Sequence, residues 1–279
     1  MRKLEGKVAF ITGAGSGIAK ASALAFSREG AKIAIAEINV ESGKAAEREV
    51  RETGGDALFV ETDVTQENNV KQAIDATVAK FGRLDVLMNC AGGTLSADVP
   101  VHEMDIGVWQ RTIALNLLHP FLVCRYGIPH LIKAGGGSIV NVTSHLGLMG
   151  SARPAYAAAK GGIISFTKTL AAQYVDYRIR ANALAPGSVP RAKMGKDREG
   201  MLSDQPGPAS RMRIVAQKLY PFSMGKPEDI AAIALFLACD DSRMLTGTTI
   251  AADGGRSSYL KMHAPEGVTL ALLGDDAEV

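Results

Sequence analysis

Short, continuously apolar segments alternate with longer helical patterns along almost the whole chain. Seven of these segments, at 7–12, 31–37, 57–61, 84–88, 138–143, 179–184 and 248–252, have the length and composition of buried strands. Strands that are apolar on both faces and joined by helices form parallel sheets that are covered on both sides. The pattern therefore predicts an α/β fold in which helices cover both faces of a seven-stranded, mainly parallel, doubly wound sheet.

The helices expected between these strands span 17–28, 41–53, 66–81, 154–175 and 227–239, with a long helix within 104–134 that Pro120 or Pro129 could break. No internal repeat or linker divides the chain, so we expect residues 1–279 to form a single domain. Two parts interrupt the alternation. The segment at about 190–225 is rich in proline and charge, which favours a substrate flap, and residues from about 256 to 279 form a C-terminal extension.

Charge and apolar pattern argue against several classes of protein. A formal net charge of +2 over 279 residues is too small to make nucleic acid the main partner. No apolar run approaches the ~20 residues that a membrane span needs, and the first residues lack the apolar core of a signal peptide, which predicts a cytoplasmic protein. The three cysteines are far apart and the five histidines do not pair at ligand spacing, so no protein-bound metal is expected.

A glycine-rich turn follows the first expected strand, with Gly13, Ser16, Gly17 and Ile18 where the strand gives way to a helix. Small residues there let a pyrophosphate approach the backbone at a helix N-terminus, where free N–H groups and the helix dipole favour an anion. A turn of this composition can also be a simple tight turn. Its place between a strand and a helix favours a dinucleotide.

Glu37 ends the second expected strand, 20 residues after Gly17. A carboxylate at this position can accept hydrogen bonds from the adenine-ribose hydroxyls and repels a 2′-phosphate, and no basic residue flanks it, so the sequence favours NAD over NADP. Asp63 and Val64 follow the third strand, where the carboxylate can bond the adenine amino group. The alternatives are a solvated glutamate at a strand end and an aspartate that caps a turn.

The fourth expected strand ends in Asn89, Cys90, Ala91 and Gly92. Short side chains at this place leave room for the ribose and nicotinamide of a cofactor on the strand ends. Asn89 fits two roles equally well, a cofactor contact or a tie between neighbouring strands.

Tyr156 and Lys160 lie four residues apart on one face of an expected helix. A phenol has a usual pKa near 10 and needs a shift of roughly 2–3 units to exchange protons near neutral pH, and a nearby lysine cation favours the phenolate. Ser144, at the end of the fifth strand, can hydrogen-bond a substrate carbonyl or alkoxide. Asn116 is an amide within an apolar helix and needs buried partners, of which a proton-relay water is one.

Together these ordered motifs resemble the short-chain dehydrogenase/reductase family, from about residue 4 to residue 255. The resemblance rests on Thr12-Gly13…Gly17, Asn89-Cys90-Ala91-Gly92, Asn116, Ser144, Tyr156…Lys160, Pro186-Gly187 and Asp253-Gly254-Gly255. It implies a single dinucleotide-binding catalytic domain of Rossmann type, a nicotinamide cofactor, and a homo-oligomer, either a tetramer or a dimer. It also implies a catalytic tetrad of Asn116, Ser144, Tyr156 and Lys160, with Tyr156 as the general acid/base.

The cofactor contacts that we expect come from the motifs and from this resemblance. They are Gly13, Ser16, Gly17, Ile18, Glu37, Asp63, Val64, Asn89, Ala91, Gly92, Tyr156, Lys160, Pro186, Gly187 and Val189. The chain departs from the family's usual pattern in that Cys90 replaces an asparagine, Ala19 replaces a glycine, and the interval from Ser144 to Tyr156 is shorter by a residue. His119 stands where glycine is frequent, and we interpret it as an interface or packing residue rather than a catalyst.

The substrate is a small-molecule alcohol or ketone in this interpretation. The residues expected around it are Gly93, Thr94, His145, Leu146, Ser188 and Arg191. His145 fits a substrate contact or a turn residue, and Arg191 fits either the cofactor pyrophosphate or an anionic substrate. The expected reaction is hydride transfer between NAD(H) and a secondary alcohol or ketone. The alternative is an NADPH-dependent carbonyl reductase of the 3-oxoacyl type, against which Glu37 argues; an isomerase or dehydratase of the same superfamily and a non-enzymatic dinucleotide sensor are more remote.

Overall fold

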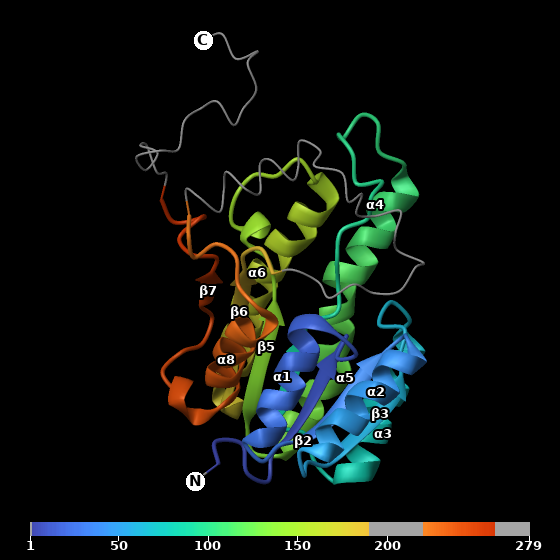
Figure 1. The fold of residues 1–279 in the computed structure, drawn as a ribbon, viewed down its shortest axis with the longest axis vertical. Coiled ribbons are helices and arrows are strands. Elements are labelled where there is room, and N and C mark those ends of the chain that lie inside the picture. Colours follow the sequence, from blue (N-terminus) through green and yellow to red (C-terminus); the bar gives the residue numbers. More distant parts are fainter. Residues whose placement is uncertain (1, 190–219, 260–279) are drawn as a thin grey trace.

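The computed structural model describes residues 2–189 and 220–259, which build one seven-stranded sheet in the order β3-β2-β1-β4-β5-β6-β7 (Figure 1). The strands are β1 (Val8–Thr12), β2 (Lys32–Glu37), β3 (Ala57–Glu61), β4 (Val86–Asn89), β5 (Gly137–Val142), β6 (Ile179–Pro186) and β7 (Thr249–Ala252). Every neighbouring pair is parallel. The predicted doubly wound α/β fold is confirmed, and the ends of the strands differ from the predicted ones by at most two residues.

Helices connect the strands and cover both faces of the sheet. They are α1 (Gly17–Arg28), α2 (Val40–Glu52), α3 (Glu67–Phe81), α4 (Ile106–Ile113), α5 (His119–Lys133), α6 (Pro154–Tyr174) and α8 (Pro227–Ala238). The long helix expected within 104–134 consists of α4 and α5 joined by a π-helical turn, Ala114–Leu118. Pro120 lies in the first turn of α5, directly after the π-helical turn, and Pro129 lies inside α5 without ending it.

Alternate residues of each central strand face two separate cores. In β1, Ala9 and Ile11 belong to the cluster that includes residues of α1 and α8, whereas Val8 and Phe10 belong to the cluster that includes residues of α3 and α5. Helices α1 and α8 pack against each other on one face, side by side in Figure 1, and α3 packs against α5 on the other. This two-sided burial explains why the strands are apolar throughout.

The parallel arrangement places the carboxyl ends of all seven strands at one edge of the sheet. The chain builds β1, β2 and β3 outward in one direction and then returns to place β4 on the other side of β1. A crevice forms at such a reversal, outside the strand ends, and ligands of doubly wound sheets bind there. The fold therefore points to the ends of β1 and β4 as the place to look for a site.

The two interruptions of the sequence pattern lie largely outside the described residues, which leave out 190–219 of the predicted flap and 260–279 of the predicted C-terminal extension. Ser188 and Met224, on either side of the first gap, form a parallel bridge. The extent of a single domain over 1–279 stays a prediction. Among the described residues, no helix is long and apolar enough to cross a membrane.

Candidate functional site

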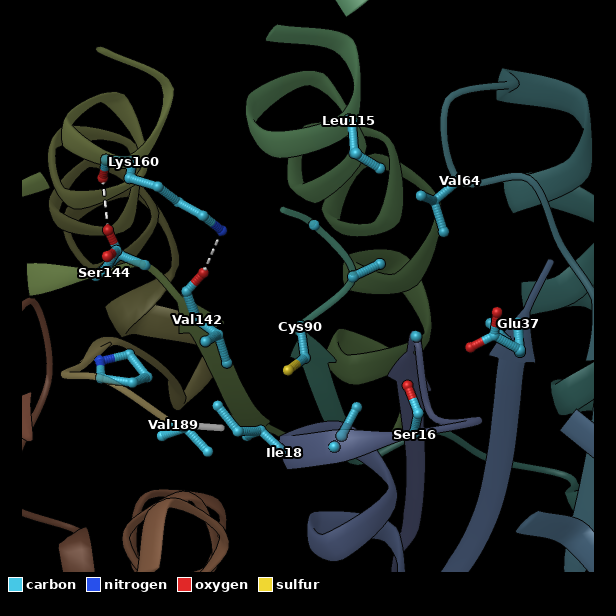
Figure 2. Close-up of a pocket in the computed structure, with 18 of the residues that line it drawn as sticks. Ser16, Ile18, Glu37, Val64, Cys90, Leu115, Val142, Ser144, Lys160 and Val189 are labelled. Carbon is cyan, nitrogen blue, oxygen red and sulfur yellow. Dashed lines mark hydrogen bonds between the residues drawn. The ribbon is translucent and has the colours of Figure 1, made fainter. Parts of the chain in front are cut away.

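A cavity of about 370 Å³ lies at the carboxyl edge of the sheet, where the strand order reverses between β1 and β4. The predicted residues that line it are Gly13, Ser16, Gly17, Ile18, Glu37, Asp63, Val64, Ala91, Gly92, Ser144, Tyr156, Lys160, Pro186, Gly187 and Val189. Figure 2 shows Glu37 at one end of the cavity, Lys160 with Ser144 at the other, and Ser16 and Cys90 between them. The structure thus gathers the predicted cofactor residues and most of the predicted catalytic residues around one cavity, while Asn89 and Asn116 lie outside its lining.

The glycine-rich turn shapes the middle of the cavity, at the N-terminus of α1. Gly13 has a left-handed backbone with φ +71°, and a Cβ there would approach the Cα of Ala91 to 3.0 Å. At Gly15, a Cβ would lie 2.8 Å from Cγ of Glu37 and 2.5 Å from Oγ of Ser42. Side chains at these two positions would collide with Ala91 and with Glu37, so glycine lets the turn pack closely against both. At Gly17, which lines the cavity, a Cβ would meet no atom within 4 Å, so the space beside the N-terminus of α1 is open to an anion.

Glu37 is held by backbone hydrogen bonds at the end of β2. The N–H of Gly15 donates to Oε2 at 3.1 Å, and the N–H of Asn39 donates to Oε1 at 3.0 Å. A carboxylate oxygen can accept more than one hydrogen bond, so Glu37 can still receive hydroxyl groups from a ligand. Asp63 accepts from both the N–H (2.9 Å) and the hydroxyl (2.7 Å) of Thr65, which makes it a turn cap that also lines the cavity.

Asn89 makes the strand tie that was one of its two predicted roles, and the cofactor contact stays a prediction. Its side chain is 1% exposed, and Nδ2 donates to Oδ1 of Asn141 at 2.8 Å, which ties β4 to β5. Nδ2 of Asn141 in turn donates to Oγ1 of Thr167 on α6 at 2.9 Å. These two hydrogen bonds hold β4, β5 and α6 in position relative to one another, and these three elements carry residues of the cavity wall.

Tyr156 and Lys160 face the cavity from α6. Lys160 is 3% exposed, and its Nζ donates to the carbonyl of Val142 at 2.9 Å, as Figure 2 shows. The same Nζ lies 5.7 Å from the centre of the Tyr156 ring, within the range of a cation–π contact. Ser144 follows β5, and its Oγ accepts the N–H of Leu146 at 3.2 Å. The arrangement places a phenol, a buried cation and a hydroxyl at the same end of the cavity.

Asn116 belongs to the π-helical turn and is completely buried. Its Oδ1 accepts the N–H of Gly93, and its Nδ2 donates to the carbonyls of Gly93 and Thr112, all at 3.0 Å. A Cβ built on Gly92 would lie 2.6 Å from Oδ1 of Asn116 and 3.3 Å from Nζ of Lys160, so the amide and the cation meet at this glycine. The proton-relay water expected at Asn116 stays a prediction.

The residues expected around a substrate lie next to the cavity, but Gly93, Thr94, His145, Leu146 and Ser188 do not line it. His145 is buried and behaves as a turn residue: its Nδ1 donates to the carbonyl of Pro186 at 3.1 Å, and burial lowers its pKa. Ser188 forms backbone hydrogen bonds with Ser223 and Gly225, both at 3.1 Å. Arg191 lies outside the described residues.

Two residues that the sequence interpretation did not assign to the site support its walls. Thr12 is fully buried, and its Oγ1 accepts the N–H groups of Cys90 at 3.0 Å and Ala91 at 3.1 Å. Asp98 is 3% exposed and accepts the N–H groups of Ala155 at 3.1 Å and Tyr156 at 3.0 Å. Asp98 therefore caps the first turn of α6 from a loop 57 residues earlier in the chain, at a helix start where Arg153 provides no side-chain cap.

We expect Asp98→Ala to lower the free energy of unfolding by about 1–3 kcal/mol, because two N–H groups at the start of α6 lose their acceptor. Turnover should fall as well, since one of those groups belongs to Tyr156. Asp98→Asn keeps an acceptor oxygen and should lose less. Denaturant unfolding and turnover measure both effects. Asp105→Ala, which removes the cap of α4 at Gly107, is the matched control for helix capping away from the cavity. An Asp98→Ala variant with unchanged stability and turnover would rule out the capping role.

His119 packs inside the protomer. It is 1% exposed, its Nδ1 lies 2.9 Å from the carbonyl of Leu115, and its Nε2 lies 3.1 Å from Oγ1 of Thr12. Burial lowers the pKa of His119 to about 3, and the Lys160 cation adds a smaller effect in the same direction. The imidazole is therefore neutral near neutral pH, which agrees with a packing role and argues against a proton-transfer role.

The same pKa predicts acid sensitivity. A histidine in the unfolded chain takes up a proton below about pH 6.5, whereas folded His119 does so only near pH 3. The neutral His119 therefore makes its full contribution to the free energy of unfolding above pH 6.5. As the pH falls from 6.5 toward 3, this free energy decreases by about 1.4 kcal/mol for each pH unit. Denaturant titrations at pH 6.5 and 4.5 measure the free energy of unfolding of the wild type and of His119→Gln. Between these two pH values, the wild type should lose about 2 kcal/mol more than the variant. Equal losses in the two proteins would contradict the lowered pKa of His119.

Metal ligands are not evident in the part of the chain that the structure describes, where no group of three or more His, Cys, Asp or Glu gathers in a way that could hold an ion. Cys90, Cys124 and Cys239 form no disulfide among the described residues. The polar chemistry of the cavity is therefore that of the carboxylates, the phenol, the lysine and the hydroxyl described above.

Comparison with known proteins places this geometry among oxidoreductases. The sequence profile of a family described as "Enoyl-(Acyl carrier protein) reductase" matches residues 13–257. The chain is 37% identical over 255 residues to a 3-oxoacyl-[acyl-carrier-protein] reductase of Thermotoga maritima, covering 91% of this chain and 98% of that protein. It is 38% identical over 256 residues to a 2,5-dichloro-2,5-cyclohexadiene-1,4-diol dehydrogenase of Sphingobium indicum, again covering 91% and 98%.

Among solved structures, a 7α-hydroxysteroid dehydrogenase complexed with NADH and 7-oxo glycochenodeoxycholic acid superimposes with a TM-score of 0.81. The two chains are 28% identical, and the match covers 91% of this chain and 95% of that one.

Proposed function

Because the chain belongs to the short-chain dehydrogenase/reductase family of oxidoreductases, we propose that it transfers a hydride between NAD(H) and a secondary alcohol or ketone. The observation that carries the proposal is the cavity itself, where Tyr156, Lys160 and Ser144 share a space with the glycine-rich turn and Glu37. A phenol beside a buried cation is suited to move a proton, and the turn is suited to hold a dinucleotide.

The residues present fit a dinucleotide along the length of the cavity. Gly13 to Ile18 would hold the pyrophosphate, Glu37 would accept the adenine-ribose hydroxyls, and Asp63 with Val64 would lie against the adenine. The open space at Gly17, where a Cβ would meet no atom within 4 Å, agrees with this fit. Ala91, Gly92, Pro186, Gly187 and Val189 would line the nicotinamide end. When bound, NAD supplies the hydride acceptor.

The chain's own groups then handle the substrate oxygen and its proton. Ser144 holds the oxygen of the alcohol, and Tyr156 takes the proton from the hydroxyl as general base. Lys160 stabilises the phenolate through its charge and can reach the nicotinamide ribose. Asn116 keeps Gly92 and Gly93 in place, and it would hold the proton-relay water through which the proton returns to solvent. Reduction of a ketone runs through the same groups in reverse.

Incubation with NAD and NADP in parallel, across secondary alcohols, sterols, sugars and hydroxy acids at mildly alkaline pH, tests the proposal. We expect reduced cofactor to form with NAD and with one chemical class of alcohol. A protein that binds NAD but reduces none of it across a broad panel, in either direction, would contradict dehydrogenase activity.

Glu37 should set the cofactor preference. We expect Glu37→Ser to raise the ratio of kcat/KM with NADP to kcat/KM with NAD by on the order of tenfold or more, because the carboxylate that repels a 2′-phosphate is gone. Glu61→Ser is a matched control, since Glu61 pairs with Glu37 on the neighbouring strand but does not line the cavity. A wild type that already prefers NADP would show that Glu37 does not select the cofactor.

A second candidate is an NADPH-dependent carbonyl reductase of the 3-oxoacyl type. The similarity to the Thermotoga maritima reductase favours it, because that protein is named for this activity. The parallel assay separates the two candidates, since this alternative requires preference for NADP(H) and reduction of 3-oxoacyl substrates.

We also propose that the protein is a homo-oligomer, a tetramer or a dimer, and that it acts in the cytoplasm. Leu118, at the end of the π-helical turn, and Phe121, in the first turn of α5, are large apolar side chains that are 40% and 43% exposed. A second copy of the chain would cover them. Sedimentation of the purified protein tests this, and a monomer at micromolar concentration would contradict it.

A further inference from the structure

His119 forms hydrogen bonds with two elements of the candidate site, and the mechanism above gives it no role. Its Nδ1 is 2.9 Å from the carbonyl oxygen of Leu115, and its Nε2 is 3.1 Å from Oγ1 of Thr12. Because a carbonyl can only accept, Nδ1 carries the proton. Nε2 of this neutral ring is then an acceptor, and the Thr12 hydroxyl donates to it. The other acceptor near that hydroxyl, the carbonyl of Met88, is farther away at 3.5 Å.

The first bond compensates for a donor that the local sequence removes. In the π-helical turn, the N–H of His119 donates to the carbonyl of Ala114, five residues earlier. With the same five-residue spacing, residue 120 would donate its N–H to the carbonyl of Leu115, but residue 120 is a proline and has no N–H. The Nδ1–H of His119 donates to this carbonyl instead. His119 and Pro120 thus act as a pair, in which one residue supplies what the other lacks.

The second bond fixes the direction of the Thr12 hydroxyl. A hydroxyl has one hydrogen to donate and two lone pairs to accept with. With its hydrogen directed to His119, Thr12 presents both lone pairs to the N–H groups of Cys90 (3.0 Å) and Ala91 (3.1 Å). All hydrogen-bonding capacity of this buried hydroxyl is then used. Cys90 and Ala91 line the cavity, as Leu115 does.

The π-helical turn and His119, which directly follows it, therefore hold the strand end from two sides. Through Thr12, His119 fixes Cys90 and Ala91, and Asn116 of the turn bonds both the N–H and the carbonyl of Gly93 at 3.0 Å. We propose that His119 is a positioning residue, which keeps the 90–93 segment and the turn that carries Asn116 in register at the nicotinamide end of the cavity. This inference rests on the proposed function, since it assigns that wall to the cofactor.

The test compares NADH binding by the wild type, His119→Ala and a matched control. Loss of both bonds should raise the dissociation constant of NADH by on the order of tenfold, with a comparable rise in KM for NAD and a lower kcat. The fluorescence of bound NADH should change as well, because the nicotinamide end of the cavity is altered. His130→Ala, on the same helix, should leave all of these values unchanged. Circular dichroism establishes that each variant is folded at the temperature of the assay.

Two further variants separate positioning from stability. His119→Asn places an amide N–H near the position of Nδ1, and Pro120→Ala in the His119→Ala background restores a backbone N–H for Leu115. Both should recover thermal stability, but both should keep the weakened NADH binding, since neither restores the acceptor for Thr12. They also keep the test usable if His119→Ala does not fold.

Folded His119 variants whose NADH affinity, KM and kcat match those of the wild type would overturn the inference and leave the proposed function intact. Recovery of NADH affinity together with stability in the two further variants would also overturn it, because it would show that His119 acts through stability alone. A wild type that binds no NADH would instead refute the proposed function, and the inference with it.

Discussion

Tyr156→Phe should lower turnover by roughly 10²–10⁴-fold, the usual contribution of a general acid/base, while the affinity for NAD stays within about twofold of the wild type. The substitution removes only the phenolic oxygen. The backbone N–H of Tyr156 still donates to Asp98, and the ring keeps its place 5.7 Å from Nζ of Lys160. The cofactor side of the cavity is therefore unchanged. The variant tests the proton-transfer step separately from cofactor binding.

Steady-state turnover, together with an NAD titration, measures this effect. Tyr126→Phe is the matched control, because its hydroxyl donates to Glu67, neither residue lines the cavity, and the hydroxyl should be dispensable for turnover. A Tyr156→Phe variant with near-normal turnover would remove Tyr156 from the mechanism.

Lys160→Met should have the second large effect. Methionine keeps much of the length of the side chain but removes the charge beside Tyr156, so the phenolate loses its stabilising cation. We expect turnover to fall by about 10²-fold or more, KM for NAD to rise, and the remaining activity to require a higher pH. The carbonyl of Val142 also loses its donor at 2.9 Å, so stability should be measured in parallel.

Lys168→Met, an exposed position on the same helix, controls for the change in charge and in helix composition. If Lys160→Met keeps its turnover and the pH dependence of the wild type, the cation has no part in activating the phenol. A variant that loses stability but not turnover would lead to the same conclusion.

The sequence predicted those parts of the fold that depend on local pattern. Continuous apolar runs such as 57–61 coincide with strands, because a strand buried on both faces needs apolar residues throughout. The ends of the strands were less certain: β6 continues to Pro186, two residues beyond its predicted end, since pairing with β7 extends it. The parallel order then places the glycine-rich turn, Ser144 and Tyr156 at one edge, which is why the cavity lining agrees closely with the expected residues.

Other parts of the site depend on contacts between residues far apart in the chain. No local pattern shows that Asp98 caps a helix by accepting the N–H of Ala155, 57 residues later, or that His119 meets Thr12 across 107 positions. Asn89 could not be assigned because a cofactor contact and a strand tie both favour a short amide at a strand end. The sequence predicted one long helix with a possible break near Pro120. It did not predict the π-helical turn, because the apolar pattern of the segment is that of a continuous helix.

The most direct test of hydride transfer at this site uses a secondary alcohol, from the class that the panel identifies, with deuterium on its carbinol carbon. After incubation with the wild type and NAD, mass spectrometry of the cofactor should show one deuterium in NADH and an unlabelled ketone. Tyr156→Phe should give almost none of this product. Deuterium released to solvent, with none in the cofactor, would contradict direct hydride transfer between substrate and NAD.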